Sequence, residues 1–201
     1  DHSLNWPYDI EFRNSKGDVL DYWREEYDAA DMTVWVECDS IAASGETDFY
    51  LYYGQENTAD ASNGDVTFLL FDDFDEGFLD TNKWSLSGGF ANLSNSVITL
   101  TASEVSGAVV ISSISSNFGN ISAEFYIKYH QSRLELGLFA RKNTYGYYHV
   151  VRSQDGKFAM YDSNGWKLLS PLVDGGILDT NYHRRTMKCV GSSISGSQDN
   201  K

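Results

Sequence analysis

The chain has 201 residues, of which 41% are hydrophobic and 14% aromatic, and its formal net charge is -14 at pH 7. An acidic surface of this kind repels nucleic-acid phosphates and anionic lipid headgroups, so we exclude nucleic acid as a partner. No apolar run approaches the roughly 18 residues of a membrane-spanning helix, and we expect no membrane insertion. The chain opens on Asp1 and His2 without a signal peptide, and we expect a mature or excised fragment of a longer protein.

The first third of the chain predicts short strands separated by polar turns. Apolar and polar residues alternate at 8–13, 32–38 and 47–54, which is the pattern of half-buried strands. The segment 19–27 fits either a strand or a helical turn. Small polar residues at 56–65 make this segment the best candidate for a domain boundary.

The stretch 121–166 predicts a β-meander, because alternating runs are separated by turn residues. Asp155-Gly156 and Asn164-Gly165 are strong hairpin signals, since these residues tolerate a positive φ. Consecutive antiparallel strands with one apolar face need a second layer, so we predict a sandwich. The expected strands of this half are 97–101, 108–112, 121–129, 134–141, 147–152, 157–161, 166–169 and 182–190.

The two cysteines, Cys38 and Cys189, lie far apart in the sequence and outside any CxxC pattern. Zinc binding and thioredoxin-like chemistry therefore lack support. We expect two buried free thiols, and a disulfide is the alternative if the fold brings the two residues together.

Several short motifs of the first third belong to one recognisable pattern. They are Asp9-Ile10-Glu11-Phe12, Gly17-Asp18, Leu20 to Tyr27, Val34-Trp35-Val36 and Tyr50-Leu51-Tyr52-Tyr53-Gly54. The pattern resembles a domain-of-unknown-function family (DUF2341) that is widespread in prokaryotic, often archaeal, surface and secreted proteins. Glu11 stands where Arg is usual and Gln55 where Asn is usual, and the usual strands before the first motif are missing. The resemblance implies no chemistry for any residue.

A looser pattern of apolar spacing follows. It comprises Phe71 to Asp75, Leu79-Asp80, Lys83-Trp84, Leu136 to Arg141 and Tyr147 to Val150. This pattern resembles a concanavalin A-like jelly roll of the laminin G or lectin/glucanase type, which implies an extracellular module that binds carbohydrate or mediates adhesion. We therefore expect an all-β protein, with a small β-rich module at 1–68 and an antiparallel β-sandwich, incomplete at its end, at 69–201.

Catalytic motifs are weak. A retaining glycoside hydrolase needs two carboxylates about 5 to 5.5 Å apart, but no E-x-D-x-E run exists, and Glu124 and Glu135 stand alone on their expected strands. There is no G-x-S-x-G elbow, and His149 fits a packed or surface position. We expect no enzymatic activity.

The richest carboxylate patch lies at 72–80. Calcium takes six to eight oxygen ligands from carboxylates and loop carbonyls, so the patch predicts a calcium site, although the distal Glu of an EF-hand is missing. The alternative is a solvated acidic turn. The candidate ligands are Asp72, Asp73, Asp75 and Asp80.

Aromatic side chains of the second half predict carbohydrate binding, because an aromatic ring stacks on the C–H face of a pyranose. Ordinary cross-strand packing is the alternative for each of them. The candidate residues are Tyr145, Tyr147, Tyr148, Tyr161 and Trp166, with Asn143, Asn164 and Asp162 as hydrogen-bonding groups. Asn92 and Asn120 match the N-glycosylation pattern.

The sequence as a whole favours a non-enzymatic extracellular surface or adhesion module that binds glycans or other surface proteins. One alternative is a purely structural module of a surface layer, filament or viral appendage. A polysaccharide-degrading enzyme is a third.

Overall fold

The structure is a computed structural model. It describes residues 3–38, 40–56, 59–103, 109–114, 119–128, 136–143, 146–152, 157–162, 167–168, 173–174 and 181–199. The chain forms two compact units, residues 1–114 and residues 115–201. Each unit is built from antiparallel strands.

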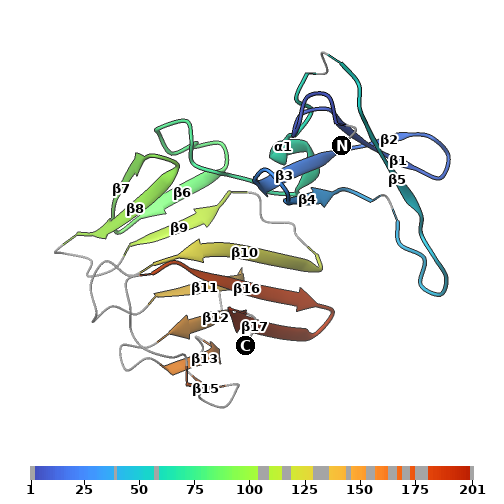
Figure 1. Cartoon of the computed structure of the whole chain (residues 1–201). Helices are drawn as coiled ribbons and strands as arrows, with labels where there is room; N and C mark the ends of the chain where they lie inside the picture. Colours follow the sequence, from blue (N-terminus) through green and yellow to red (C-terminus); the bar gives the residue numbers. More distant parts are fainter. Residues whose placement is uncertain are drawn as a thin grey trace. The chain divides into compact units, whose positions relative to one another are not determined.

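One sheet of the first unit has the strand order β2-β1-β5 (Figure 1). It contains β1 (Ile10–Asn14), β2 (Val19–Leu20) and β5 (Phe49–Tyr53), and both pairings are antiparallel. The turn between β1 and β2 places Gly17 at a φ of 89°, which side-chain-bearing residues rarely adopt. The strands predicted at 8–13 and 47–54 are confirmed.

A second sheet of the first unit pairs β3 (Tyr22–Tyr27) with β4 (Met32–Val36). The segment 19–27 is therefore two strands, β2 and β3, and the chain passes from one sheet to the other between them. The hydrophobic core joins the two sheets and consists of Ile10, Phe12, Leu20 and Tyr22. Three side chains of β4 pack against this core, namely Met32, Val34 and Val36.

A helical turn, α1 (Gly64–Thr67), follows β5. Its N-cap residue Asn63 accepts a hydrogen bond from the Asp65 N–H at 3.0 Å. Four residues are too few to show a helical period in the sequence. The N-cap hydrogen bond of Asn63 is therefore the local feature that starts this helix, in a segment predicted from the sequence to be a domain boundary.

Two more strand pairs lie in the first unit. The pairing of β6 (Trp84–Ser87) with β9 (Val110–Ser113) is antiparallel. The pair of β7 (Gly89–Ser94) and β8 (Val97–Ala102) is a hairpin. Asn95 and Ser96 connect its strands at φ values of 53° and 55°, as a tight hairpin turn requires. The sequence analysis did not predict β6 and β7.

One sheet of the second unit has the order β10-β16-β17. It contains β10 (Ile121–Ile127), β16 (His183–Val190) and β17 (Ser193–Gln198). The middle strand, β16, is the most buried, with Met187 at 1% exposure and Cys189 at 0%. Asn120 accepts a hydrogen bond from the Gly191 N–H at 2.7 Å and so ties the start of β10 to the β16–β17 turn.

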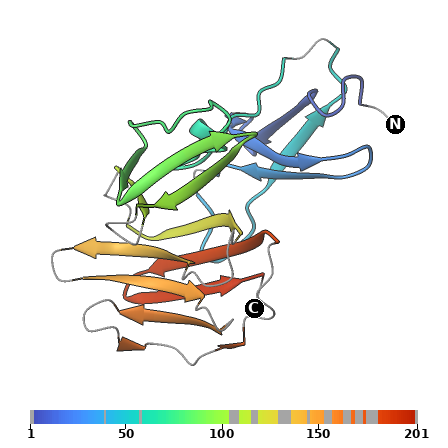
Figure 2. The same ribbon diagram turned by 90° about the vertical axis from the view of Figure 1, so that its left-hand side faces the viewer.

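The other sheet of the second unit has the order β11-β12-β13-β14, with β15 also paired to β13 (Figures 1 and 2). Its strands are β11 (Leu136–Asn143), β12 (Gly146–Arg152), β13 (Lys157–Asp162), β14 (Lys167–Leu168) and β15 (Val173–Asp174). The predicted meander is confirmed from β11 to β14. It is wrong at its first strand, because β10 pairs with β16 instead of β11.

The all-β class is confirmed, and the sheets of the described residues have two to five strands each. The boundary predicted near residue 68 stays a prediction and falls inside the first compact unit. In the described part of the chain, no helix has the length and apolar character needed to cross a membrane. Both cysteines are free, Cys189 buried and Cys38 half-buried.

Candidate functional site

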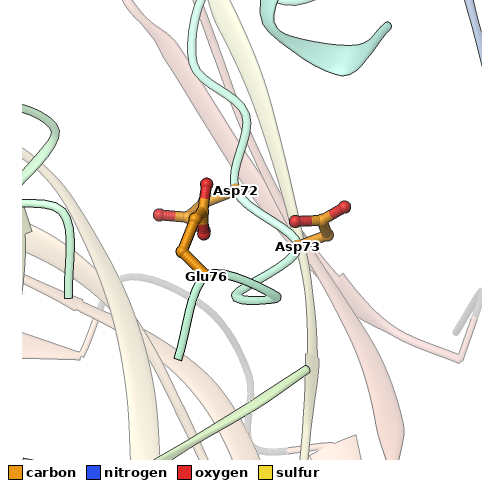
Figure 3. Close-up of side chains that lie close together, drawn as sticks. All are labelled: Asp72, Asp73 and Glu76. Atoms are coloured by element: carbon orange, nitrogen blue, oxygen red, sulfur yellow. The ribbon is translucent and has the colours of Figure 1, made fainter. Parts of the chain in front are cut away.

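Three carboxylates converge on the turn that connects α1 with β6. Oxygen atoms of Asp72, Asp73 and Glu76 all lie within 4.8 Å of one another. Asp72 is half-buried, and the other two are exposed. Figure 3 shows the three side chains gathered on this tight turn. We call them the acidic triad.

Local hydrogen bonds hold Asp72 in place. One of its oxygens accepts a hydrogen bond from the Phe74 N–H at 2.8 Å, and the other accepts one from Trp84 Nε1 at 2.5 Å. Phe74 has a φ of 58°, which folds the chain back so that Glu76 returns towards Asp72. The buried Trp84 therefore anchors the turn to the start of β6.

An open hollow of about 220 Å³ lies beside the acidic triad. Two aromatic residues are among those that line it, Trp23 and Phe71, and their ring centroids are 4.8 Å apart in an edge-to-face arrangement. Polar and charged groups complete the lining, namely Ser62, Asn63, Asp65, Asp73, Asp75, Glu76 and Lys83.

A small aromatic cluster sets the shape of this hollow. Phe68 stacks on Phe71 at 5.8 Å and meets both Trp23 and Trp35 edge-to-face. Phe71 lies directly over Gly64, where an added Cβ would come within 2.3 Å of the ring. Only glycine lets α1 approach the aromatic ring so closely.

Arg24 holds in place the loop around Asp60 and Ser62, which contributes Ser62 to the lining of the hollow. Its guanidinium forms two hydrogen bonds with Asp60, at 2.7 and 3.1 Å, and it lies over the rings of Tyr8 and Tyr27 at 5.0 Å. The Arg24 N–H also donates to Ser62 Oγ at 2.9 Å. A bidentate pair of this kind is more rigid than a single ion pair, so Ser62 and the loop beside it are held in position.

Negative charges outnumber positive charges among the residues that line the hollow. Lys83 pairs with Asp65 at 2.7 Å, and this hydrogen bond raises the pKa of Lys83. Neighbouring protein atoms partly desolvate the Asp73 carboxyl and so raise its pKa, and the charge of Asp75 raises it further. The negative charges near Asp73 are therefore only partly compensated, which is the electrostatic condition in which a bound cation stabilises a site.

The structure brings together only some of the predicted calcium ligands. Asp72 and Asp73 meet, and Asp75 lines the hollow without joining the acidic triad. Asp80 turns instead to Asn82, accepting hydrogen bonds from its backbone N–H at 2.8 Å and its side chain at 3.0 Å. The third carboxylate of the acidic triad is therefore Glu76, which was not among the predicted ligands.

Three of the predicted carbohydrate-binding residues lie outside the described residues, namely Tyr145, Asn164 and Trp166. The others lie on strands of one sheet, where Tyr161 is opposite His149, Tyr148 is opposite Asp162 and Asn143 is opposite Gly146. Tyr147 lies on β12 next to Tyr148. Their role stays a prediction.

Both predicted glycosylation sites are exposed, Asn92 on β7 and Asn120 just before β10. The Asn120 side chain already accepts a hydrogen bond from Gly191. A glycan at Asn120 would have to keep or replace this contact.

The sequence analysis missed the hollow itself. Trp23 comes from β3 and Phe71 from the segment after α1, and nothing in their spacing shows that they meet. Lys83 was noted only as part of a family-like pattern. A detectable signal was the Asn63-Gly64-Asp65 run, which is an N-cap followed by a glycine.

Residues 6–87 match the family described as "Domain of unknown function (DUF2341)". The search of curated proteins and the search of solved structures both ended without a match. The matched segment contains β1 to β5, α1, the acidic triad and every residue that lines the hollow. The resemblance noted in the first third of the sequence is thus confirmed, and residues 6–87 are similar to this domain of unknown function.

Proposed function

We propose that the protein is a non-enzymatic surface or adhesion module that works outside the cell and binds a calcium ion at the acidic triad. The observation that carries the proposal is the convergence of Asp72, Asp73 and Glu76 beside a hollow lined mainly by polar and charged groups. Three carboxylates on one turn supply hard oxygen ligands, and loop carbonyls and water complete the coordination of a calcium ion.

Calcium suits this turn better than magnesium. Magnesium requires near-ideal octahedral geometry, whereas calcium accepts irregular sets of six to eight oxygens. The acidic triad comes from a five-residue turn whose shape is set by the Asp72 hydrogen bonds, so its geometry is irregular. A cation there would also offset the desolvation and the charge of Asp75, which together raise the pKa of Asp73.

The hollow supports a carbohydrate as the ligand of this module. Sugar sites combine an aromatic ring with carboxylate and amide groups that accept and donate hydrogen bonds. Polar groups such as Asn63, Asp73 and Asp75 make up most of the lining, and Trp23 and Phe71, whose rings pack on each other, contribute a small apolar part. We propose the same ligand class for the second half of the chain, with a concanavalin A-like sandwich over residues 69–201.

A calcium titration tests the proposal. We expect millimolar calcium to raise the melting temperature of the whole chain and to give a saturable heat of binding by calorimetry. Asp73→Asn and Glu76→Gln should each abolish both effects, because each removes a charged ligand. Glu37→Gln is the matched control, since Glu37 is exposed and lies outside the acidic triad. Its titration should equal that of the unchanged chain.

The same preparation would be applied to a glycan array with and without calcium. Specific glycan binding supports the adhesion module. An unchanged melting temperature together with an empty array would favour the purely structural alternative and remove the calcium site.

A further inference from the structure

The strand β5 leaves an unusually large apolar surface uncovered. All five of its residues are large and uncharged, and their exposures are 51% for Phe49, 51% for Tyr50, 48% for Leu51, 53% for Tyr52 and 56% for Tyr53. Isolated exposed apolar residues are common on protein surfaces, but a contiguous group marks an interaction site.

The pairing register explains why both faces of β5 are exposed. Tyr53 lies opposite Ile10 and Leu51 opposite Phe12, so one face of β5 continues the core-facing side of β1. Ile10 and Phe12 are buried at 3% and 7% exposure, whereas their neighbours on β5 are half exposed. The side chains of β3 and β4 therefore cover the core-facing side of β1 and leave that of β5 exposed.

The strand also has a free edge. Among the described strands, β5 pairs only with β1 and lies at the end of the β2-β1-β5 sheet. Proteins usually protect such an edge with a charge, a proline or a β-bulge. The strand β5 has neither charge nor proline, and its register with β1 runs without a shift from Tyr53 to Phe49. Nothing within the strand opposes the addition of another strand.

We propose that β5 pairs with β5 of a second copy of this chain, antiparallel and centred on Leu51. The sequence of the strand is self-complementary in this register. Leu51 faces Leu51 of the partner subunit, Tyr50 faces the partner's Tyr52, and Phe49 faces the partner's Tyr53. Every pair is aromatic with aromatic or leucine with leucine, and such cross-strand pairs stabilise antiparallel sheets. The arrangement has two-fold symmetry and forms a closed dimer.

The exposed surface of the five residues sets an upper limit on the area that this pairing can bury. An aromatic side chain offers about 200 Å², so five half-exposed residues offer about 500 Å² per copy, or about 1,000 Å² in total. This total is at the lower limit of specific protein interfaces. The dimer therefore dissociates readily on dilution.

Charge opposes the dimer and makes it depend on salt. Each copy carries a formal net charge of -14, and the proposed register brings Glu46 of one copy towards Glu56 of the partner subunit. Salt screens the repulsion between exposed charges. Dimerisation is thus stronger at high ionic strength, the opposite of an interface held by ion pairs.

Sedimentation equilibrium of the whole chain is the first test. As the concentration rises from about 5 to about 500 µM, the average mass should rise from 22.6 kDa towards twice that value. The rise should occur at lower concentration in about 0.5 M salt than in about 0.02 M salt. A monomer at every concentration and in both salts would overturn the proposal.

Charged substitutions at the centre of the strand test the register. Leu51→Lys and Leu51→Glu should each be monomeric, because like charges then meet on the two-fold axis. An equimolar mixture of the two should form a heterodimer, since residue 51 of one copy faces residue 51 of the other. A heterodimer cannot be explained by misfolding, and circular dichroism of each variant alone checks its fold.

Val19→Lys is the matched control. Val19 is 60% exposed and lies on β2, at the opposite edge of the same sheet. This variant should dimerise like the unchanged chain. A mixture that stays monomeric, or a loss of dimer in Val19→Lys, would show that the dimer does not form through β5. Tyr50→Lys serves as a second central variant if the Leu51 variants fail to fold.

Discussion

The neighbouring strands β1 and β5 have the same length but differ in composition and in burial. They pair antiparallel along their whole length, and each has five residues. Ile10 and Phe12 of β1 are buried, whereas every residue of β5 is about half exposed. The more apolar of the two strands is therefore the less buried.

The comparison teaches that burial depends on the covering layer rather than on the composition of the strand. Tyr22 packs edge-to-face on Phe12 at 5.4 Å. The core cluster, to which β4 contributes Met32, Val34 and Val36 as packing residues, contains no residue of β5. The aromatic residues of β5 thus remain available for another strand.

The largest effect expected from this comparison is that of Phe12→Ala. Removing a buried phenylalanine side chain should lower the free energy of unfolding of the first unit by about 4 kcal/mol. Urea denaturation followed by tryptophan fluorescence measures the change, because Trp6, Trp23, Trp35 and Trp84 all lie in residues 1–114. A loss below about 1 kcal/mol would show that the two sheets do not share a core.

An intermediate effect is expected at Asp9, which links the start of β1 to the end of β5. Burial raises the pKa of its carboxyl, but hydrogen bonds from Ser3 Oγ and from the backbone N–H groups of Leu4 and Gly54 outweigh this and lower the pKa from 3.8 to about 2. Asp9→Asn should cost about 2 kcal/mol near neutral pH, as expected for the loss of hydrogen bonds to a charged group.

The pH dependence of Asp9 has a definite sign. Its folded-state pKa is lower than the unfolded value, so the stabilisation is fully present above pH 3.8 and is lost as the pH falls towards 2. The difference in unfolding free energy between the unchanged chain and Asp9→Asn should therefore shrink from pH 6 to pH 3. A difference that is constant over this range would contradict the ionised, hydrogen-bonded carboxylate.

The smallest effect is expected for Tyr50→Thr. Tyr50 is 51% exposed and lies opposite Arg13 on β1. Threonine keeps a high strand propensity, so the monomer should lose less than about 1 kcal/mol. The measurement requires micromolar protein, where the proposed dimer is dissociated. A loss comparable to that of Phe12→Ala would mean that β5 is covered after all.

The sequence predicts strands well where one face is covered. Alternation in 32–38 matches β4, whose residues alternate between half-buried and exposed. The partner of a strand is harder to predict, since β10 pairs with a strand more than 50 residues further along the chain. Alternation assigns a face to each residue but carries no information about which strand lies beside it.

The candidate site was predictable in part for a similar reason. Adjacent carboxylates such as Asp72 and Asp73 remain neighbours in any fold. The acidic triad contains Glu76 instead of the predicted Asp80. This difference depends on the turn at Phe74 and on the hydrogen bond from Trp84 to Asp72. These contacts join residues up to 12 positions apart, and the sequence shows no local pattern for them.

The buried thiol of Cys189 has a practical consequence. Its exposure is 0%, while Cys38, in the other unit, is half-buried. A thiolate reacts with a labelling reagent only when the reagent can reach it. Labelling at Cys38 should thus be fast, and labelling at Cys189 should wait for the second unit to open. The natural chain therefore contains one reporter for each unit, and a two-phase labelling curve would measure how independently the two units open.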